Sequence, residues 1–486
     1  MLNVFIKNRI IMILVFIYVI VNSVMIYLDN YYLLFIPVLL ILSYLYIYHL
    51  NAVFLLIVFF TPLSFNFEDL ELGGIGLYFP TEPMLLVFSV IFILKYLKRN
   101  SPKETIVHYK HPITILIIVQ LIWIIITSLF SDLFIISIKF FISRSWFVIP
   151  VFFYAIHFFK EGKHRILQFL WCFITPMFIV TCYTLINHMN NSFSEASGHW
   201  VMWPFFKDHT SYGAILALSI PITIWLFLEY KKSKIKYLLC LFLVVFLIGI
   251  YFSYTRAAWL SIFGALIVYL LYYYKIKFKW IISFLTVFGL LFTLNFNSIY
   301  NQIEKNDSEH TTENFSERLE SMSNVSSDAS NLERLNRWNC AVKLFKEKPF
   351  LGWGPGTYSF VYAPFQESSD LTIISTNFGN GGNAHSEYLG PLAEQGIIGL
   401  LIMVTLVGIF FYLSGKYYIK SNHIFNKQLC LMIILALTTY FSHGVLNNYL
   451  DTDKASIPIW GLLAMFVCLD TYYDKVNKST ERIKNK

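Results

Sequence analysis

Long apolar segments follow one another along most of the chain, and one long polar segment interrupts them. Runs of about 14 to 22 apolar residues, close to the length that crosses a bilayer as a helix, recur from the N-terminus onwards. From about Ser298 to Gln395 the pattern changes to a polar loop of roughly a hundred residues, far longer than the usual connection. The pattern predicts an all-α polytopic integral membrane protein with one large loop outside the membrane.

The apolar runs predict about fourteen transmembrane helices, within a range of about twelve to fourteen. The third run is short and Pro62 interrupts it, so a re-entrant hairpin made by the third and fourth runs is the alternative there. The expected spans are Ile10 to Leu28, Tyr31 to Tyr48, Ala52 to Phe65, Glu82 to Leu97, Ile113 to Phe130, Ile138 to Phe159, Ile166 to Ile186, Tyr212 to Leu228, Tyr237 to Tyr254, Ala257 to Tyr274, Ile281 to Phe296, Gly396 to Tyr412, Gln428 to Val445 and Ile457 to Thr471.

This pattern divides the chain into three expected parts. Residues 1–297 form an N-terminal transmembrane bundle of about eleven spans, and residues 298–395 form the large loop with the catalytic segment. Residues 396–486 form C-terminal transmembrane helices and a tail. Within the loop, the stretch from Asn301 to Asn331 is rich in Ser, Asn, Asp and Glu, which predicts a mobile segment because so little apolar surface is available for burial.

The stretch from Asn331 to Lys348 has the spacing of an amphipathic helix. Ser330 and Glu333 form a capping-box pattern at its start. Arg334 and Arg337 are expected on its other faces, and the glycine-rich turn from Gly352 to Gly356 ends it. The residues at helical spacing are Leu335, Trp338, Val342 and Phe345.

The last part of the loop carries a candidate base, His385. Asn383 is the predicted N-cap of a helix that runs towards Gln395 and kinks near Gly390-Pro391, which places His385 in the first turn. The positive end of a helix lowers the pKa of an imidazole and leaves a neutral ring that accepts a proton. The alternative is a structural histidine that caps the helix or bonds to a carbonyl.

Composition excludes a single soluble domain, because 57% of the residues are hydrophobic. Of the six cysteines, all but Cys340 fall within apolar spans, which argues against a disulfide framework or a cysteine metal site. No Walker motif, zinc-type His pair or dinucleotide fingerprint is present. We therefore expect neither a cofactor nor a metal.

The distribution of Lys and Arg predicts the orientation in the membrane. With the N-terminus inside, most of the 37 Lys and Arg residues fall on the cytoplasmic side, in short basic connections such as Lys231 to Lys236 and Lys416 to Lys427. Both termini are then cytoplasmic and the large loop faces outwards. The net charge of +8 mainly reflects this topology, and it gives no case for nucleic acid.

A few Lys and Arg side chains are expected on the outer side of the membrane, although these residues favour the cytoplasmic side. Arg256 lies in a tight turn between two spans, whereas Lys139 and Arg144 lie within a span that begins near Ile138. Arg256 either reaches lipid phosphates or binds a substrate anion, and an arginine inside a span usually faces a cavity or a partner. Arg337 either lies on a solvated helix face or belongs with these cations. Together with a neutral His385, the guanidinium groups of Arg144, Arg256 and Arg337 predict an anion site next to a base.

Four motifs resemble one known family, the O-antigen ligase and polymerase superfamily of bacterial membrane glycan transferases. They lie between about Ile138 and Val445, and each is weak alone. The motifs are Lys207 to Gly213 ahead of a span, Thr255 to Trp259, Arg334 to Trp338 leading to Gly352 to Tyr358, and His385 to Leu389 continuing through Glu394 to Gly396.

The resemblance implies transfer of a glycan from undecaprenyl diphosphate to an acceptor sugar hydroxyl at the periplasmic face of the bacterial inner membrane, without metal or nucleotide. On this basis His385 deprotonates the acceptor, Arg256 and Arg337 hold the leaving diphosphate, and Arg144 assists at the membrane boundary. Attack opposite the leaving group inverts the anomeric centre. The supporting positions are Lys139, Arg334, His209 and Glu394.

Several functions share these motifs. The leading hypothesis is an O-antigen ligase that joins a polysaccharide to lipid A core. A polymerase that extends repeat units and a protein O-oligosaccharyl ligase are the alternatives that use the same donor. A lipid-linked glycan flippase or other transporter is the alternative from a different class, although a carrier has no need of a glycine-rich loop that presents a histidine, and the chain shows no internal repeat.

Overall fold

A computed structural model describes residues 2–66, 77–98, 106–276, 329–367 and 381–473. It divides into two compact units, Met1–Leu56 and Ile57–Lys486. Nearly all of the described residues lie in helices or short turns, and β1 (Phe65–Asn66) and β2 (Tyr78–Phe79) form the two-stranded sheet found among them. The predicted all-α membrane fold is confirmed.

The first unit consists of apolar helices, which are α1 (Leu2–Tyr27), a short 3-10 turn (Tyr32–Leu34), α2 (Phe35–Tyr48) and the start of α3 (Leu50–Phe60). Large apolar side chains are exposed along α1 from Met12 onwards and along α2. Exposed apolar surface of this kind is typical of helices in contact with lipid.

The second unit contains the long helices and the candidate site. Its helices are α4 (Thr81–Leu97), α5 (Ile106–Tyr109), α6 (Pro112–Leu129), α7 (Phe134–Val148), α8 (Ala155–Lys160), α9 (Lys163–Asn190), α10 (Glu195–Gly198), α11 (His209–Glu229), α12 (Ile235–Tyr251), α13 (Arg256–Tyr273), α16 (Ala329–Glu347), α17 (Tyr358–Val361), α18 (Leu389–Lys420), α19 (Ile424–His443) and α20 (Asp453–Cys468). A π-helical turn, Ile149–Tyr154, joins α7 to α8, and a second, Leu469–Tyr473, follows α20.

Within the described part of the chain, eight helices are long and apolar enough to cross a membrane. Shorter apolar helices, α12 among them, accompany these eight. The expected third span is only the 11-residue α3, and β1 and β2 link it to α4. The expected span from Ile281 to Phe296 and the polar stretch that follows it lie outside the described residues, so the total of about fourteen stays a prediction.

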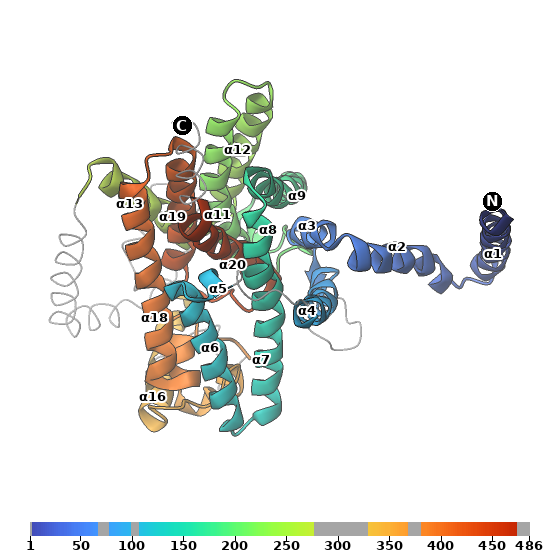
Figure 1. The fold of residues 1–486 in the computed structure, drawn as a ribbon. Helices are drawn as coiled ribbons and strands as arrows, with labels where there is room; N and C mark the ends of the chain where they lie inside the picture. The colour runs from blue at the N-terminus through green and yellow to red at the C-terminus, as the bar shows by residue number, and fades with distance from the viewer. Residues whose placement is uncertain (1, 67–76, 99–105, 277–328, 368–380, 474–486) are drawn as a thin grey trace. The chain divides into compact units, whose positions relative to one another are not determined.

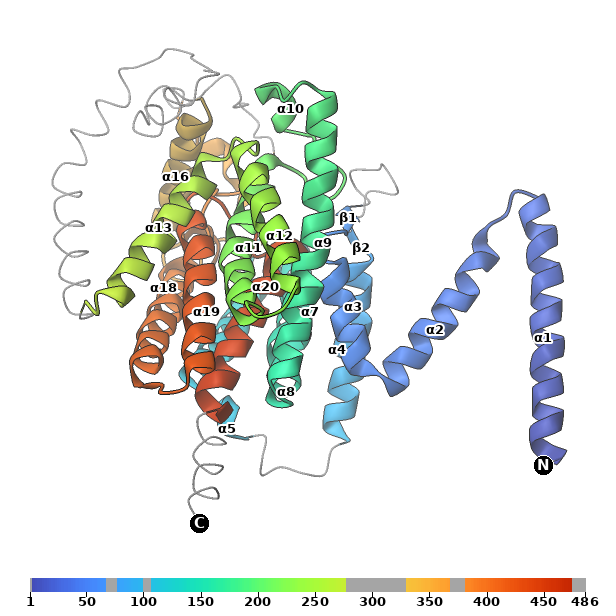
Figure 2. The same cartoon turned by 90° about the horizontal axis from the view of Figure 1, so that it is seen from above.

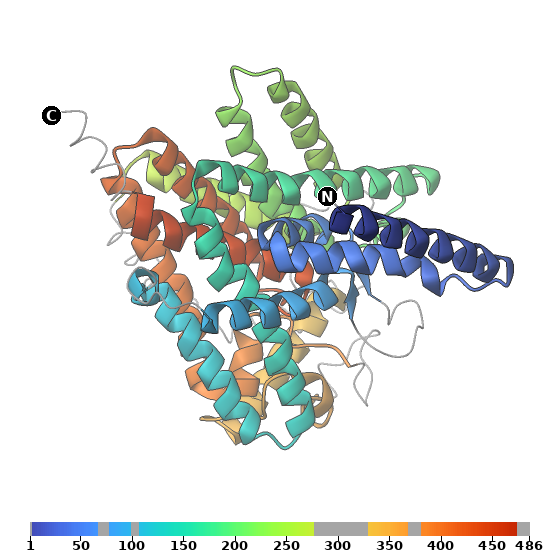
Figure 3. The same cartoon turned by 45° about the vertical axis from the view of Figure 1, so that its right-hand side comes forward.

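The core of the second unit is built around α11, α19 and α20, whose side chains are largely buried. α11 packs against α19 and α12, and α13 packs against α19. α18 lies along α6 and supports α16, as Figure 3 shows for α6 and α18. Helices from distant parts of the sequence therefore surround the candidate site.

α18 contains a sharp break at Gly396, where φ is 69°. A Cβ at this position would lie 2.3 Å from the Phe350 carbonyl oxygen, so only glycine fits this close approach. The carbonyl of Pro349 accepts the freed N–H of Ile397 at 2.9 Å. The kink predicted at Gly390-Pro391 was therefore wrong by about one and a half turns, because the break is placed by contact with the turn that follows α16.

The basic connections and the candidate site lie at opposite ends of the second unit. In Figure 2 the α8–α9 and α18–α19 connections lie at the lower end, whereas α10 and α16 lie at the upper end. This arrangement follows the charge asymmetry that the sequence analysis used for orientation.

Candidate active site

The segment that carries His385 is a loop held by its own side chains. Asn383 Oδ1 accepts the backbone N–H of His385 at 3.0 Å, which is an Asx turn. His385 has a φ of 49°, in the left-handed region. The Ser386 hydroxyl accepts the N–H groups of Tyr388 and Leu389 at 3.2 and 3.3 Å, where α18 begins.

His385 therefore lies four residues before the helix, and its predicted place in a first turn was wrong. A left-handed residue cannot continue a right-handed helix. Asn383 caps the turn that presents His385 and does not cap α18.

Two side chains of α16 fix this loop from the other side. Arg337 Nη1 donates to the Asn383 carbonyl at 3.2 Å, and Trp338 Nε1 donates to the His385 carbonyl at 3.4 Å. A Cβ at residue 382 would lie 2.4 Å from Arg337 Nη1, so Gly382 allows the guanidinium to approach the backbone. α16 thus fixes the positions of the Asn383 and His385 carbonyl groups, which lie on either side of Ala384.

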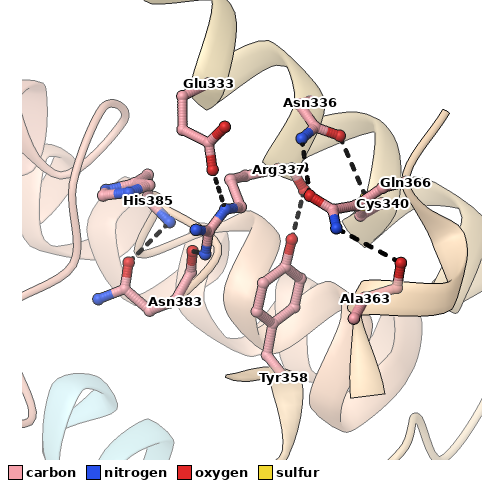
Figure 4. Close-up of polar contacts among 9 residues, drawn as sticks. All are labelled: Glu333, Asn336, Arg337, Cys340, Tyr358, Ala363, Gln366, Asn383 and His385. Carbon is pink, nitrogen blue, oxygen red and sulfur yellow. Dashed lines mark hydrogen bonds and ion pairs between the residues drawn. The ribbon is translucent and has the colours of Figure 1, made fainter. Parts of the chain in front are cut away.

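Arg337 is one of the largest fully buried side chains of the described residues, with 1% of its surface exposed. Its Nε donates to Glu333 Oε1 at 2.7 Å, and its guanidinium carbon lies 4.3 Å from the centre of the Tyr362 ring. The Tyr358 hydroxyl donates to the Arg337 carbonyl at 2.6 Å. Figure 4 shows the contacts with Glu333 and Tyr358 converging on Arg337 beside His385.

The existence of α16 was predicted correctly, but its buried face was not. Val342, expected on the apolar face, is 36% exposed, whereas Glu333 and Arg337 are buried. The polar face can be buried because its charged groups satisfy one another and the loop. Further along the same helix, Cys340, Ala341 and Leu344 are buried in an apolar cluster with Tyr358 and Tyr362.

The ring of His385 is half-buried, and among the described residues neither ring nitrogen has a hydrogen-bond partner. Burial, with the positive charges of Arg334 and Arg337, lowers the pKa of His385 to about 4, although Glu333 and Asp208 oppose this. The neutral form was expected from a helix N-terminus. It is instead favoured by desolvation and by two arginines.

Asp208 and His209 approach this site from the start of α11. Asp208 Oδ1 accepts the N–H of Ser211 at 2.7 Å and the Thr210 hydroxyl at 2.5 Å, which makes Asp208 the N-cap. The Thr210 hydroxyl also bonds to that of Tyr449. The Nδ1 atoms of His209 and His199 lie 3.1 Å apart, so the supporting residue His209 turns its ring towards a second histidine.

Arg256 is the first residue of α13, as the tight turn in the sequence predicted. The hydroxyl of Thr255 donates to the His209 carbonyl at 2.8 Å, so the starts of α11 and α13 lie together. Asp208 and Arg334 both act electrostatically on His443, the last residue of α19. The site is therefore assembled from α11, α13, α16, α19 and the His385 loop.

Arg144 and Glu394 lie together in a cavity of about 240 Å³. Arg144 is buried on α7, and its Nη2 donates to Asp451 Oδ1 at 2.5 Å. Glu394, on α18, accepts the N–H of Tyr358 at 3.0 Å. Lys139 is exposed on α7. The structure thus brings Arg334 and Arg337 to His385, and it groups Arg144 with Glu394.

Four polar residues of the site were not given their observed roles by the sequence analysis. Asp208 precedes Ser211 with the spacing of an N-cap, and Glu333 precedes Arg337 with the spacing of a helical ion pair, so local patterns could have found both. Asn383 was identified as a cap for the wrong element. Asp451 gives no local signal, because it lies 307 residues from its partner Arg144.

Within the described ranges, no three His, Cys, Asp or Glu side chains lie together as metal ligands would. Residues 241–404 match a protein-family model described as O-antigen ligase. The matched segment includes α13, α16 and the His385 loop, which together supply Arg256, Arg334, Arg337 and His385. A comparison with curated proteins finds no match.

Proposed function

We propose, from the membership of this chain in the O-antigen ligase and polymerase superfamily, that it is a membrane glycosyltransferase which transfers a glycan from undecaprenyl diphosphate to an acceptor sugar hydroxyl. The acceptor in this proposal is lipid A core. The reaction takes place at the periplasmic face of the bacterial inner membrane, and both termini are cytoplasmic. It uses no metal and no nucleotide, because the diphosphate already activates the donor.

One observation supports this proposal most strongly. His385 presents a neutral ring with no hydrogen-bond partner among the described residues, next to Arg334 and on a loop fixed by α16. A general base needs a free nitrogen, a fixed backbone and a pKa at or below the working pH. A purely structural histidine normally has its ring nitrogens bonded.

In the proposed step, His385 takes the proton of the acceptor hydroxyl as the hydroxyl oxygen attacks the anomeric carbon. The bond between that carbon and the diphosphate oxygen breaks, and the electron pair leaves with undecaprenyl diphosphate. Attack from the opposite side inverts the anomeric centre. Cationic groups stabilise the negative charge that develops on the leaving diphosphate.

We assign the diphosphate to Arg256 and Arg334, with Lys139 and His209 as supporting residues. The family resemblance implies Arg337, and not Arg334, as the second diphosphate ligand. However, the buried contacts of Arg337 with Glu333, Asn383 and Tyr362 support a different role, which is to position the His385 loop. A guanidinium whose N–H donors already bond protein groups, and whose face is covered by an aromatic ring, is poorly placed to bind a phosphate.

The function is tested by reconstituting the purified protein with a glycan on undecaprenyl diphosphate and three acceptors. We expect lipid A core to gain the mass of the glycan. Extension of a second lipid-linked glycan identifies a polymerase, and modification of a peptide identifies a protein ligase. Movement of the lipid-linked glycan across the bilayer without any transfer would contradict the proposal in favour of a flippase.

A further inference from the structure

A cavity of about 240 Å³, lined by both polar and apolar side chains, lies behind the His385 loop and has no role in the steps described above. Its walls come from α6, α7, α18, the loop itself and the segment between α19 and α20. Asn383, Ala384 and Ser386 line it, so its occupant would lie against the segment that carries the base. His385 itself is not among the residues that line the cavity, and its pKa responds to Arg334, Arg337 and Glu333 on α16.

Arg144 offers unused hydrogen-bond donors in this cavity. The residue is 7% exposed, and its Nη2 donates to Asp451. Its Nε and Nη1 are buried and have no partner among the described residues. Asn448 Oδ1, on another wall, is a buried acceptor that likewise has no partner there. Buried polar groups are nearly always bonded, so these atoms indicate a ligand that both accepts and donates hydrogen bonds.

The charges of the walls disfavour an anion. Arg144 faces Asp451 directly, and Glu387 and Glu394 also line the cavity. Even with both glutamates protonated, the charge of Arg144 is balanced by that of Asp451. A phosphate would therefore enter a site without excess positive charge, unlike the surroundings of Arg334 and Arg256. Neutral hydroxyl groups satisfy the same donors and acceptors at no electrostatic cost.

The size of the cavity limits the ligand to one ring. Pockets for drug-sized ligands begin at about 300 Å³, and an engineered cavity of about 150 Å³ in another protein holds a benzene ring. The cavity lies between these sizes. Phe140 and Tyr358 provide apolar wall surface beside the polar groups, as the C–H faces of a sugar require.

We infer that this cavity is a subsite for one neutral sugar ring of the acceptor, held by Arg144 and Asp451 through its hydroxyl groups. This inference rests on the proposed function, and it assigns one sugar ring of the acceptor to this cavity. Arg144 is then a specificity residue for the acceptor, and it does not assist the diphosphate. The ring is held close to the loop that presents the base.

The test measures binding to the full-length protein in nanodiscs by saturation-transfer NMR. The probes are methyl glucoside, methyl galactoside, N-acetylglucosamine and inorganic pyrophosphate. We expect at least one pyranoside to bind, and Arg144→Met and Asn448→Ala to weaken it by about tenfold or more, since each removes a buried hydrogen bond to the ligand. Arg165→Met, which removes a partly exposed, ion-paired arginine, is the matched control and should leave binding unchanged.

Asn448→Ala keeps the test valid if Arg144→Met does not fold, as judged by its elution and melting temperature. The inference is overturned if no pyranoside binds, if both variants bind the sugar normally, or if Arg144→Met abolishes pyrophosphate binding instead. Transfer by the wild-type protein separates the two proposals. Normal transfer without sugar binding at this cavity refutes the subsite alone, and Arg144-dependent sugar binding without transfer refutes the function alone.

Discussion

Arg337 provides the sharpest test of how the site is held together. Its Nε bonds Glu333 and its Nη1 bonds the Asn383 carbonyl, two residues before His385. If Arg337 positions the loop, its loss should reduce turnover and leave donor affinity unchanged. If it holds the diphosphate, its loss should reduce donor affinity first.

The expected stability effects follow from burial. Removing Arg337 alone breaks its buried ion pair with Glu333, which costs about 3–5 kcal/mol, and the lost charged hydrogen bond to Asn383 adds about 1.5–3 kcal/mol. Replacing both partners with apolar residues of similar volume is often neutral or stabilising. The double variant Arg337→Met, Glu333→Leu should therefore fold with a melting temperature close to that of the wild type.

Turnover of the double variant should nevertheless fall by about 100-fold, because a misplacement of about 1 Å at a reacting group has that effect. The two deleted charges act on His385 in opposite directions, so the acid limb of its pH profile should stay in place. The assay is single-turnover transfer at saturating donor, with donor affinity measured separately.

Arg165→Met with Glu161→Leu is the matched control, since these residues form a partly exposed i,i+4 ion pair at the connection between α8 and α9. It should change stability by less than about 1 kcal/mol and leave turnover unchanged. Wild-type turnover at saturating donor with much weaker donor binding in the Arg337 double variant would refute positioning and make Arg337 a diphosphate ligand.

Three further predictions follow from the site and the topology. Burial and two arginines lower the pKa of His385 to about 4, and only the neutral ring acts as a base, so kcat/KM should stay level as pH falls from 8 to about 5 and decline towards 4. A decline of kcat/KM centred near pH 6.5 would contradict this. Arg256→Lys should weaken donor binding by about tenfold or more, because an ammonium lacks the forked donors that suit a diphosphate, and unchanged binding in a well-expressed variant would point to lipid contact instead. Lys346→Cys should react with an impermeant maleimide added outside spheroplasts, above the signal of the unsubstituted protein, whereas Lys232→Cys should not, and the reverse labelling would invert the topology.

The helical membrane fold was predictable because the hydrophobic pattern that selects it is local. The same holds for α16, which follows the helical spacing of its apolar residues, and for Arg256 at the start of α13. Contacts between distant segments were not predictable in this way. The break of α18 falls at Gly396 and not at Pro391, because the Phe350 carbonyl of a separate turn packs against it.

The site shows the same limit. The sequence pointed to His385, Arg334 and Arg337, and the structure brings these three together. The buried face of α16 was wrong because periodicity assumes that apolar residues face inwards, whereas Glu333 and Arg337 are buried as a bonded pair. The Arg144–Asp451 pair was invisible because only the tertiary fold joins residues so far apart.

The central claim is that His385 is the general base, and His385→Gln tests it most directly. An amide keeps hydrogen bonding but cannot take the proton, so transfer should fall by about two to four orders of magnitude. Donor affinity, measured on the same preparation, should stay near that of the wild type because arginines hold the diphosphate. His164→Gln, which changes an exposed histidine in the first turn of α9, should behave as the wild type. Lost donor binding with near-normal transfer at saturating donor would contradict the account and make His385 a donor ligand.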